Sequence, residues 1–136
     1  MQKPEISVVI PFLNEEENLP ELTAALESYA QALPVPIEVI FVDDGSTDGS
    51  VAWLRGAHFT HFTAKIVKLS KNFGSHPAVR AGFLHASAPN CVWLGADLQE
   101  PLEIIGSAYA KLREGYDLVC IQKNQVKVAK SEELFS

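Results

Sequence analysis

Residues 37–50 read Ile-Glu-Val-Ile-Phe-Val-Asp-Asp-Gly-Ser-Thr-Asp-Gly-Ser, and this stretch decides the fold. The run Val39–Val42 consists of β-branched and aromatic residues, which predicts a buried strand. Two carboxylates, Asp43 and Asp44, follow directly. Acids placed there need a partner if they are buried, and ligands of open α/β sheets bind beyond the carboxyl ends of the strands. We therefore expect the pair to bind a ligand. A Gly-Ser turn follows, with a helix cap expected at Ser46, Thr47 or Asp48.

The rest of the chain alternates between strand and helix patterns. Further apolar runs predict strands at Ile6–Phe12, Ala64–Leu69, Cys91–Leu94 and Tyr116–Ile121. Helical spacing predicts helices after Asn14, around Ser50–Gly56, from His76 or Pro77 to Ala86, and over Pro101–Leu112. This order predicts an α/β fold with a mostly parallel sheet, right-handed crossovers and helices on both faces.

Two boundaries of this fold can be predicted. Pro11 should mark the end of the first strand, because proline cannot donate to a ladder. Asn14 should cap the next helix, with three glutamates, Glu15 to Glu17, in its first turn. Residues 1–121 are expected to form the domain. Residues 122–136 are polar and basic, and we expect a loop leading into a helix, the start of a C-terminal segment missing from this sequence.

Composition narrows the function classes. The formal net charge is −6 and the pI is about 5.1, which argues against nucleic-acid binding and indicates that a cation mediates any anionic ligand. Cys91 and Cys120 lie in apolar runs without metal-ligand spacing, so we expect two buried small side chains. The N-terminal apolar run is too short for a signal peptide, and no run approaches the ~20 residues of a membrane helix. A cytoplasmic protein is expected, with peripheral attachment of a longer chain to a membrane left open.

Four polar clusters follow predicted strands: residues 14–16, 43–48, 71–72 and 97–100. The carboxyl ends of parallel strands share one edge, so these clusters should converge there. Simpler interpretations remain for some members. Glu16 and Glu17 are expected to be a solvated first helical turn, and Asp48 can be a helix cap alone.

The clusters predict a nucleotide site. Hard divalent cations prefer oxygen ligands, which Asp97 and Gln99 offer, so Mg²⁺ or Mn²⁺ could hold a diphosphate there. Asp44 could accept hydrogen bonds from a base or ribose, and Lys71 could meet a phosphate. No Walker loop or GxGxxG motif is present, so P-loop and dinucleotide-binding proteins are disfavoured. His58 and His61 are expected on the surface or in packing.

The motifs resemble the family 2 glycosyltransferases with the GT-A fold, and among them the polyprenyl-phosphate sugar transferases. The matching segments are Ser7-Val-Val-Ile-Pro-Phe-Leu-Asn-Glu-Glu, Val42-Asp-Asp-Gly-Ser-Thr-Asp-Gly-Ser, Leu69-Ser-Lys-Asn-Phe-Gly and Ala96-Asp-Leu-Gln-Glu-Pro. The resemblance implies a three-layer α/β/α fold of the nucleotide-diphospho-sugar transferases. It also implies sugar transfer with inversion at the anomeric carbon. A lipid phosphate acceptor is already a strong nucleophile, so the reaction would not need a general base from this chain. By resemblance, Pro11, Asn14 and Glu15 line the base pocket, Asp43 and Asp44 grip the base or ribose, and Asp97 and Gln99 hold metal and diphosphate.

Two departures from the family pattern leave an alternative open. The metal motif, usually Asp-Ala-Asp, reads Gly95-Ala96-Asp97 here, and the family's catalytic domain continues well beyond residue 136. The chain therefore resembles the donor-binding part of an enzyme, and the alternative is a truncated or degenerate module that binds nucleotide without catalysis. A phosphoacceptor receiver domain is disfavoured, because receivers carry the acidic pair on their first strand.

Overall fold

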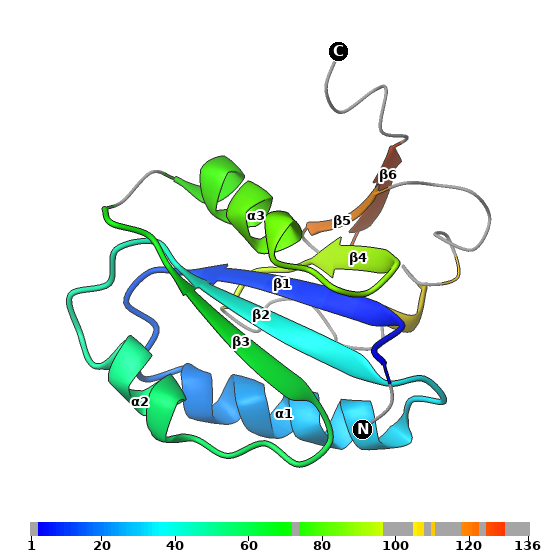
Figure 1. The fold of residues 1–136 in the computed structure, drawn as a ribbon, viewed down its shortest axis with the longest axis horizontal. Coiled ribbons are helices and arrows are strands. Elements are labelled where there is room, and N and C mark those ends of the chain that lie inside the picture. The colour runs from blue at the N-terminus through cyan, green and yellow to red at the C-terminus, as the bar shows by residue number, and fades with distance from the viewer. Residues whose placement is uncertain are drawn as a thin grey trace.

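The computed structural model describes residues 3–71, 74–96, 105–107, 110, 118–122 and 125–129. A six-stranded sheet has the order β3-β2-β1-β4-β5-β6, and helices cover both of its faces, α1 and α2 on one side and α3 on the other (Figure 1). The strands are β1 (Ile6–Phe12), β2 (Ile37–Asp43), β3 (Thr63–Lys68), β4 (Asn90–Trp93), β5 (Leu118–Gln122) and β6 (Gln125–Ala129). The helices are α1 (Leu19–Ala32), α2 (Ser50–Gly56) and α3 (Ser75–Leu84).

The strand order of the sheet contains one reversal, beside β1. From β1 the chain moves outward to β2 and β3, all parallel, and then returns to β4 on the other side of β1. β1 and β2 pair along their whole length, from Ile6 opposite Ile37 to Phe12 opposite Asp43. Open α/β sheets bind ligands where the strand order reverses, outside the carboxyl ends of the strands. The crevice predicted by this rule lies beyond the ends of β1 and β4, next to the end of β2.

The core is divided by the central strands into two layers. On β1, Ile6, Val8 and Ile10 face α1 and α2, whereas Val9 faces α3. This alternation is the period of two that strand geometry requires. Both central strands are buried almost throughout, as expected for parallel strands covered on both faces. The parallel α/β/α fold predicted from the sequence is therefore confirmed.

The helix predicted to be capped by Asn14 begins later. Helix α1 starts at Leu19 after Asn18, and Asn14 has a φ of 54°, so the predicted cap at Asn14 was wrong. The physical reason is that the Asn14 side chain binds a different loop, as shown below. Pro11 also does not end its strand, because β1 continues through Phe12.

The polar tail was also mispredicted in part. Residues 125–129 form β6, which pairs antiparallel with β5, where a loop leading into a helix was expected. The neighbouring strand supplies the hydrogen-bond partners that the tail sequence alone does not reveal. Of the predicted helix over Pro101–Leu112, residues 105–107 and 110 are helical, and its other residues lie outside the described part of the chain. No helix among the described residues is long and apolar enough to span a membrane.

Candidate functional site

The loops that follow β1 and β2 are joined by hydrogen bonds from Asn14. Its backbone N–H donates to Oγ of Ser46 at 2.8 Å. Its side-chain Oδ1 accepts from the backbone N–H groups of Thr47, at 2.8 Å, and Asp48, at 3.2 Å. Hydrogen bonds of Asn14 thus connect the first predicted polar cluster, residues 14–16, with the second, residues 43–48. The structure brings these two clusters together, as expected.

A second set of bonds runs beside the first. The N–H of Gly49 donates to Oε2 of Glu16 at 3.1 Å, and the N–H of Glu16 donates to Oδ2 of Asp48 at 3.3 Å. The N–H of Glu15 donates to Oγ of Ser50 at 3.1 Å. We call Asn14–Glu16 and Ser46–Ser50 together the interloop clamp. Glu16 is exposed, as predicted, but it lies before α1 rather than in a first helical turn, and its carboxylate binds the Gly49 amide.

Asp48 organises the start of α2. Its Oδ1 accepts from the N–H of Ser50, at 3.0 Å, and from the Ser50 hydroxyl, at 2.5 Å. The hydroxyl bond is the main influence that lowers the pKa of Asp48, so this carboxylate stays ionised near neutral pH. The residue before the helix is Gly49, which makes no side-chain cap bond. Of the three predicted caps, only Asp48 binds an amide of the helix.

The acidic pair is buried at the end of β2. Asp43 is fully buried, and its Oδ1 accepts from the N–H of Ser46 at 2.9 Å. Its Oδ2 is also buried and has no hydrogen-bond partner in the structure described. Asp44 is 7% exposed, and its Oδ2 accepts from the N–H of Gly74 at 3.1 Å. A buried carboxylate oxygen without a donor is unfavourable, so this oxygen atom calls for an explanation.

The other predicted site residues are placed as follows. Pro11 is half-buried in β1, opposite Val42. Glu15 accepts a side-chain bond from Asn18 at 2.6 Å. Lys71 is exposed after β3. The predicted metal ligands, Asp97 and Gln99, lie outside the described residues. Within the described ranges, no group of three or more His, Cys, Asp or Glu side chains could hold a metal ion.

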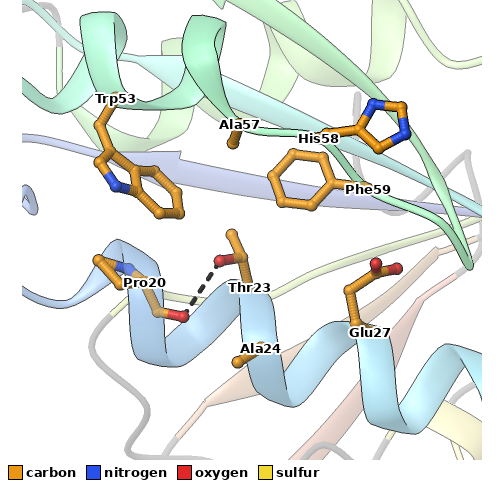
Figure 2. A pocket seen from close by; sticks show the side chains of 8 residues that line it. All are labelled: Pro20, Thr23, Ala24, Glu27, Trp53, Ala57, His58 and Phe59. Carbon is orange, nitrogen blue, oxygen red and sulfur yellow. Dashed lines mark hydrogen bonds between the residues drawn. The ribbon is translucent and has the colours of Figure 1, made fainter.

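Two cavities lie away from the interloop clamp. The first, of about 310 Å³, lies between α1 and the segment Trp53–Phe59 (Figure 2). The second, of about 180 Å³, is lined by residues at the amino-terminal ends of β2 and β3 and beside them. His58 lines the first and His61 the second, and both are exposed, which agrees with their predicted surface position. Neither cavity is lined by the acidic pair.

Parallel strands with a reversal beside β1, and a buried acidic pair at the end of β2, define an α/β protein of the GT-A type. The model of glycosyl transferase family 2 matches residues 7–133, and the chain belongs to that family. Solved structures agree with this fold. Residues 1–349 of Staphylococcus aureus TarS align with a TM-score of 0.66 and 25% identity, over 81% of this chain and 32% of that one. A mannosyltransferase from Pyrobaculum calidifontis aligns with a TM-score of 0.65 and 24% identity, and the alignment covers 81% of this chain and 32% of that one.

Curated relatives are more similar in sequence. An uncharacterized glycosyltransferase of Synechocystis is 42% identical over 115 residues, which cover 85% of this chain and 36% of the relative. An undecaprenyl-phosphate 4-deoxy-4-formamido-L-arabinose transferase of Enterobacter is 44% identical over 117 residues, which cover 84% of this chain and 35% of the relative. The chain therefore spans about a third of the length of these relatives.

Proposed function

We propose that the chain is the donor-binding part of a glycosyltransferase that moves a sugar from a nucleoside diphosphate to an acceptor with inversion. The observation that carries the proposal is Oδ2 of Asp43, which is buried without a hydrogen-bond donor among the described residues. Family membership supports it. So do the complexes of TarS with UDP and with UDP-GlcNAc, and that of the Pyrobaculum enzyme with GDP-Man and Mn²⁺.

The acidic pair would bind the nucleoside. A base N–H or a ribose hydroxyl can donate to Oδ2 of Asp43, which would then gain its missing partner. The carboxylate of Asp44 is fixed by Gly74 and offers a second acceptor. Pro11 and Glu15, at the end of β1, would border the base. Lys71 would meet a phosphate as a point charge.

A divalent metal, Mg²⁺ or Mn²⁺, is proposed at Asp97 and Gln99, whose oxygen atoms suit hard cations. When bound, the ion would offset the charge that develops on the leaving diphosphate. Gly95 replaces one carboxylate of the family motif, so fewer protein ligands are available there.

The acceptor is proposed to be a polyprenyl phosphate, because the Enterobacter relative acts on undecaprenyl phosphate. One phosphate oxygen would attack the anomeric carbon from the face opposite the diphosphate. The new carbon–oxygen bond forms as the bond to the diphosphate breaks, and the nucleoside diphosphate leaves with the electron pair. An ionised phosphate oxygen is already a nucleophile, so no residue of this chain is assigned as a general base. A transferase that uses such an acceptor would work at a membrane, and we propose the cytoplasmic face.

Calorimetry with UDP and GDP tests the donor site, in Mn²⁺ and in EDTA. We expect one of the two to bind, Asp43→Asn to weaken binding in both buffers, and Asp97→Ala to weaken only the metal-dependent part. Failure of the unmodified chain to bind either nucleotide would refute the proposal. The second candidate, a nucleotide-binding module without activity, is favoured by Gly95, which stands where the family motif has a carboxylate. Turnover of UDP- or GDP-sugars onto a polyprenyl phosphate by the chain alone would exclude it.

A further inference from the structure

We infer that Asn14 is a positioning residue: it holds the loop after β2 in the shape that presents Asp43 and Asp44 to the nucleoside, and does not bind the nucleotide itself. The inference rests on the proposed donor site. It gives Asn14 a different role from that of a base-pocket residue, which the family resemblance implies.

The side-chain oxygen of Asn14 already accepts as many hydrogen bonds as it has lone pairs. An amide oxygen has two lone pairs, and the N–H groups of Thr47 and Asp48 donate to this one at 2.8 and 3.2 Å. No acceptor capacity remains for a base N–H. Only the Nδ2 group could still donate to a nucleotide, and the experiment below isolates that group.

The backbone of Asn14 adopts an uncommon conformation. Asn14 has a φ of 54°, and no other non-glycine residue in the described ranges has a positive φ. Asparagine tolerates this left-handed region better than most residues, yet a residue held there signals a constraint from its surroundings. The conformation directs the backbone N–H of Asn14 to Ser46 while its side chain reaches Thr47.

Hydrogen bonds through Ser46 connect Asn14 to Asp43 of the acidic pair. Ser46 accepts the Asn14 N–H through its hydroxyl and donates its own N–H to Oδ1 of Asp43 at 2.9 Å. With Oδ1 held, the carboxylate of Asp43 is oriented with Oδ2 left for the ligand. Two hydrogen bonds thus connect the backbone of Asn14 to Asp43. The side chain of Asn14 holds Thr47 and Asp48, which directly follow Ser46, so its loss would loosen the same loop.

Glu16 strengthens the same arrangement from a separate position. Its carboxylate accepts the N–H of Gly49, and its own N–H donates to Asp48. Its side chain is exposed. Glu16 thus offers a second way to loosen the loop without touching Asn14.

The central variant is Asn14→Gly, which keeps the backbone conformation and removes the acceptor. In the ligand-free chain, hydrogen exchange at the amides of Thr47 and Asp48 should quicken. The Kd for UDP or GDP should rise roughly tenfold, because the loop must then be ordered at the expense of binding. Unchanged exchange or unchanged affinity would overturn the inference.

Asn14→Asp separates positioning from contact. It keeps an acceptor for both amides but lacks the Nδ2 donor, so the Kd should stay within about threefold of the wild-type value, since an exposed added charge has a small effect. A loss as large as that of Asn14→Gly would mean that Nδ2 binds the nucleotide, and would overturn the inference. If Asn14→Gly fails to fold, Glu16→Ala tests the same clamp. Its Kd should rise and the amide of Gly49 should exchange faster, while Glu16→Gln, which keeps an acceptor, should restore both.

Glu27→Ala is the matched control. Glu27, on the helix α1 shown in Figure 2, also accepts two backbone N–H bonds across loops, from Thr60 and His61, each at 2.7 Å. Its loss should quicken exchange at those two amides and leave nucleotide affinity unchanged. If Glu27→Ala raised the Kd for the nucleotide as much as Asn14→Gly does, the effect would be a general one of loosened loops, and the inference would be overturned. If the unmodified chain binds neither UDP nor GDP, the proposed donor site is refuted. If the unmodified chain binds and Asn14→Gly binds equally well, only the positioning role of Asn14 is refuted.

Discussion

Ser87 donates two hydrogen bonds to Glu38, 49 residues earlier in the chain: one from its N–H, at 3.0 Å, and one from its hydroxyl. Glu38 lies near the start of β2 and is only 1% exposed. Lys65 of β3 adds a contact at 3.4 Å and also donates to the carbonyl of His85 at 2.8 Å. A buried charge is tolerated only when it is paired and hydrogen-bonded, as this one is. These bonds fix the connection from α3 to β4 at the end of the sheet opposite the interloop clamp.

The stability of the fold should depend on the ionisation of Glu38. Burial is the largest influence and raises its pKa, but the bonds from Ser87 and the charge of Lys65 together hold the pKa below the ordinary value of 4.5. A lowered pKa in the folded state adds stability above pH 4.5, which is lost as the pH falls through the folded pKa. Urea unfolding at a series of pH values should show this loss. The Glu38→Gln variant should be less stable at pH 7 by about 1–3 kcal/mol and show a flatter curve in acid. An equally steep curve in the variant would assign the acid sensitivity elsewhere.

Gly82→Ala should destabilise the protein, because α3 packs closely on the sheet there. An added Cβ would clash with Cγ1 of Val9 and lie 3.1 Å from Cγ2 of Val42, and both valines are fully buried. Overpacking of this kind costs about 1–3 kcal/mol, which thermal or urea unfolding measures. Gly56→Ala is the control: nothing lies within 4 Å of its added Cβ, so stability should stay the same or rise slightly. Equal effects of the two variants would contradict the packing argument.

Gly49→Ala should weaken nucleotide binding with little loss of stability. Its Cβ would lie 2.9 Å from Cδ of Glu16 and push that carboxylate off the Gly49 amide. The Glu16 side chain is exposed and can move, so the fold should lose less than about 1 kcal/mol. Calorimetry with UDP or GDP and a thermal melt measure the two effects. In a Glu16→Ala background the substitution should have no further effect on affinity, and an additive loss would argue against their shared action.

Asp44→Asn should weaken nucleotide binding whether or not metal is present, since the acidic pair is assigned to the nucleoside and Asp97 to the metal. Loss of a charged acceptor corresponds to roughly a tenfold to hundredfold rise in Kd. Titrations in Mn²⁺ and in EDTA provide the comparison, with Asp97→Ala alongside. An effect of Asp44→Asn confined to Mn²⁺ would show that the assigned roles are wrong.

Sequence reasoning predicted what depends on local pattern. The strands predicted at Ile6–Phe12 and Val39–Val42 carry runs of β-branched residues, which suit a covered sheet. The first was found with its predicted bounds, and the second is longer at both ends, from Ile37 to Asp43. The alternation of elements then predicted the parallel sheet and the gathering of Asn14 and Asp43 at one edge. Cys91, expected to be buried, is half-buried, and burial with the nearby charge of Glu38 raises its pKa.

Partners distant in the sequence explain most of the failures. An asparagine followed by glutamates is the pattern of a helix cap, and only the amides of Thr47 and Asp48, 33 and 34 residues away, decide that Asn14 binds elsewhere. The carboxylate of Glu16 likewise binds a distant amide, that of Gly49, 33 residues away. For the strand at 125–129, the alternation of Val126 and Val128 with polar residues was a usable signal that the tail interpretation missed.

Every residue of the interloop clamp lies between Asn14 and Ser50, within one β1–α1–β2 segment and the first residue of the next helix. The groups that shape the Ser46–Ser50 loop therefore come from one contiguous segment of the chain, brought together when β1 and β2 pair across a single crossover. The residues proposed for metal and diphosphate come after β4 in the sequence. A family member that keeps residues 14–50 therefore keeps the whole interloop clamp, even where its sequence differs after α2.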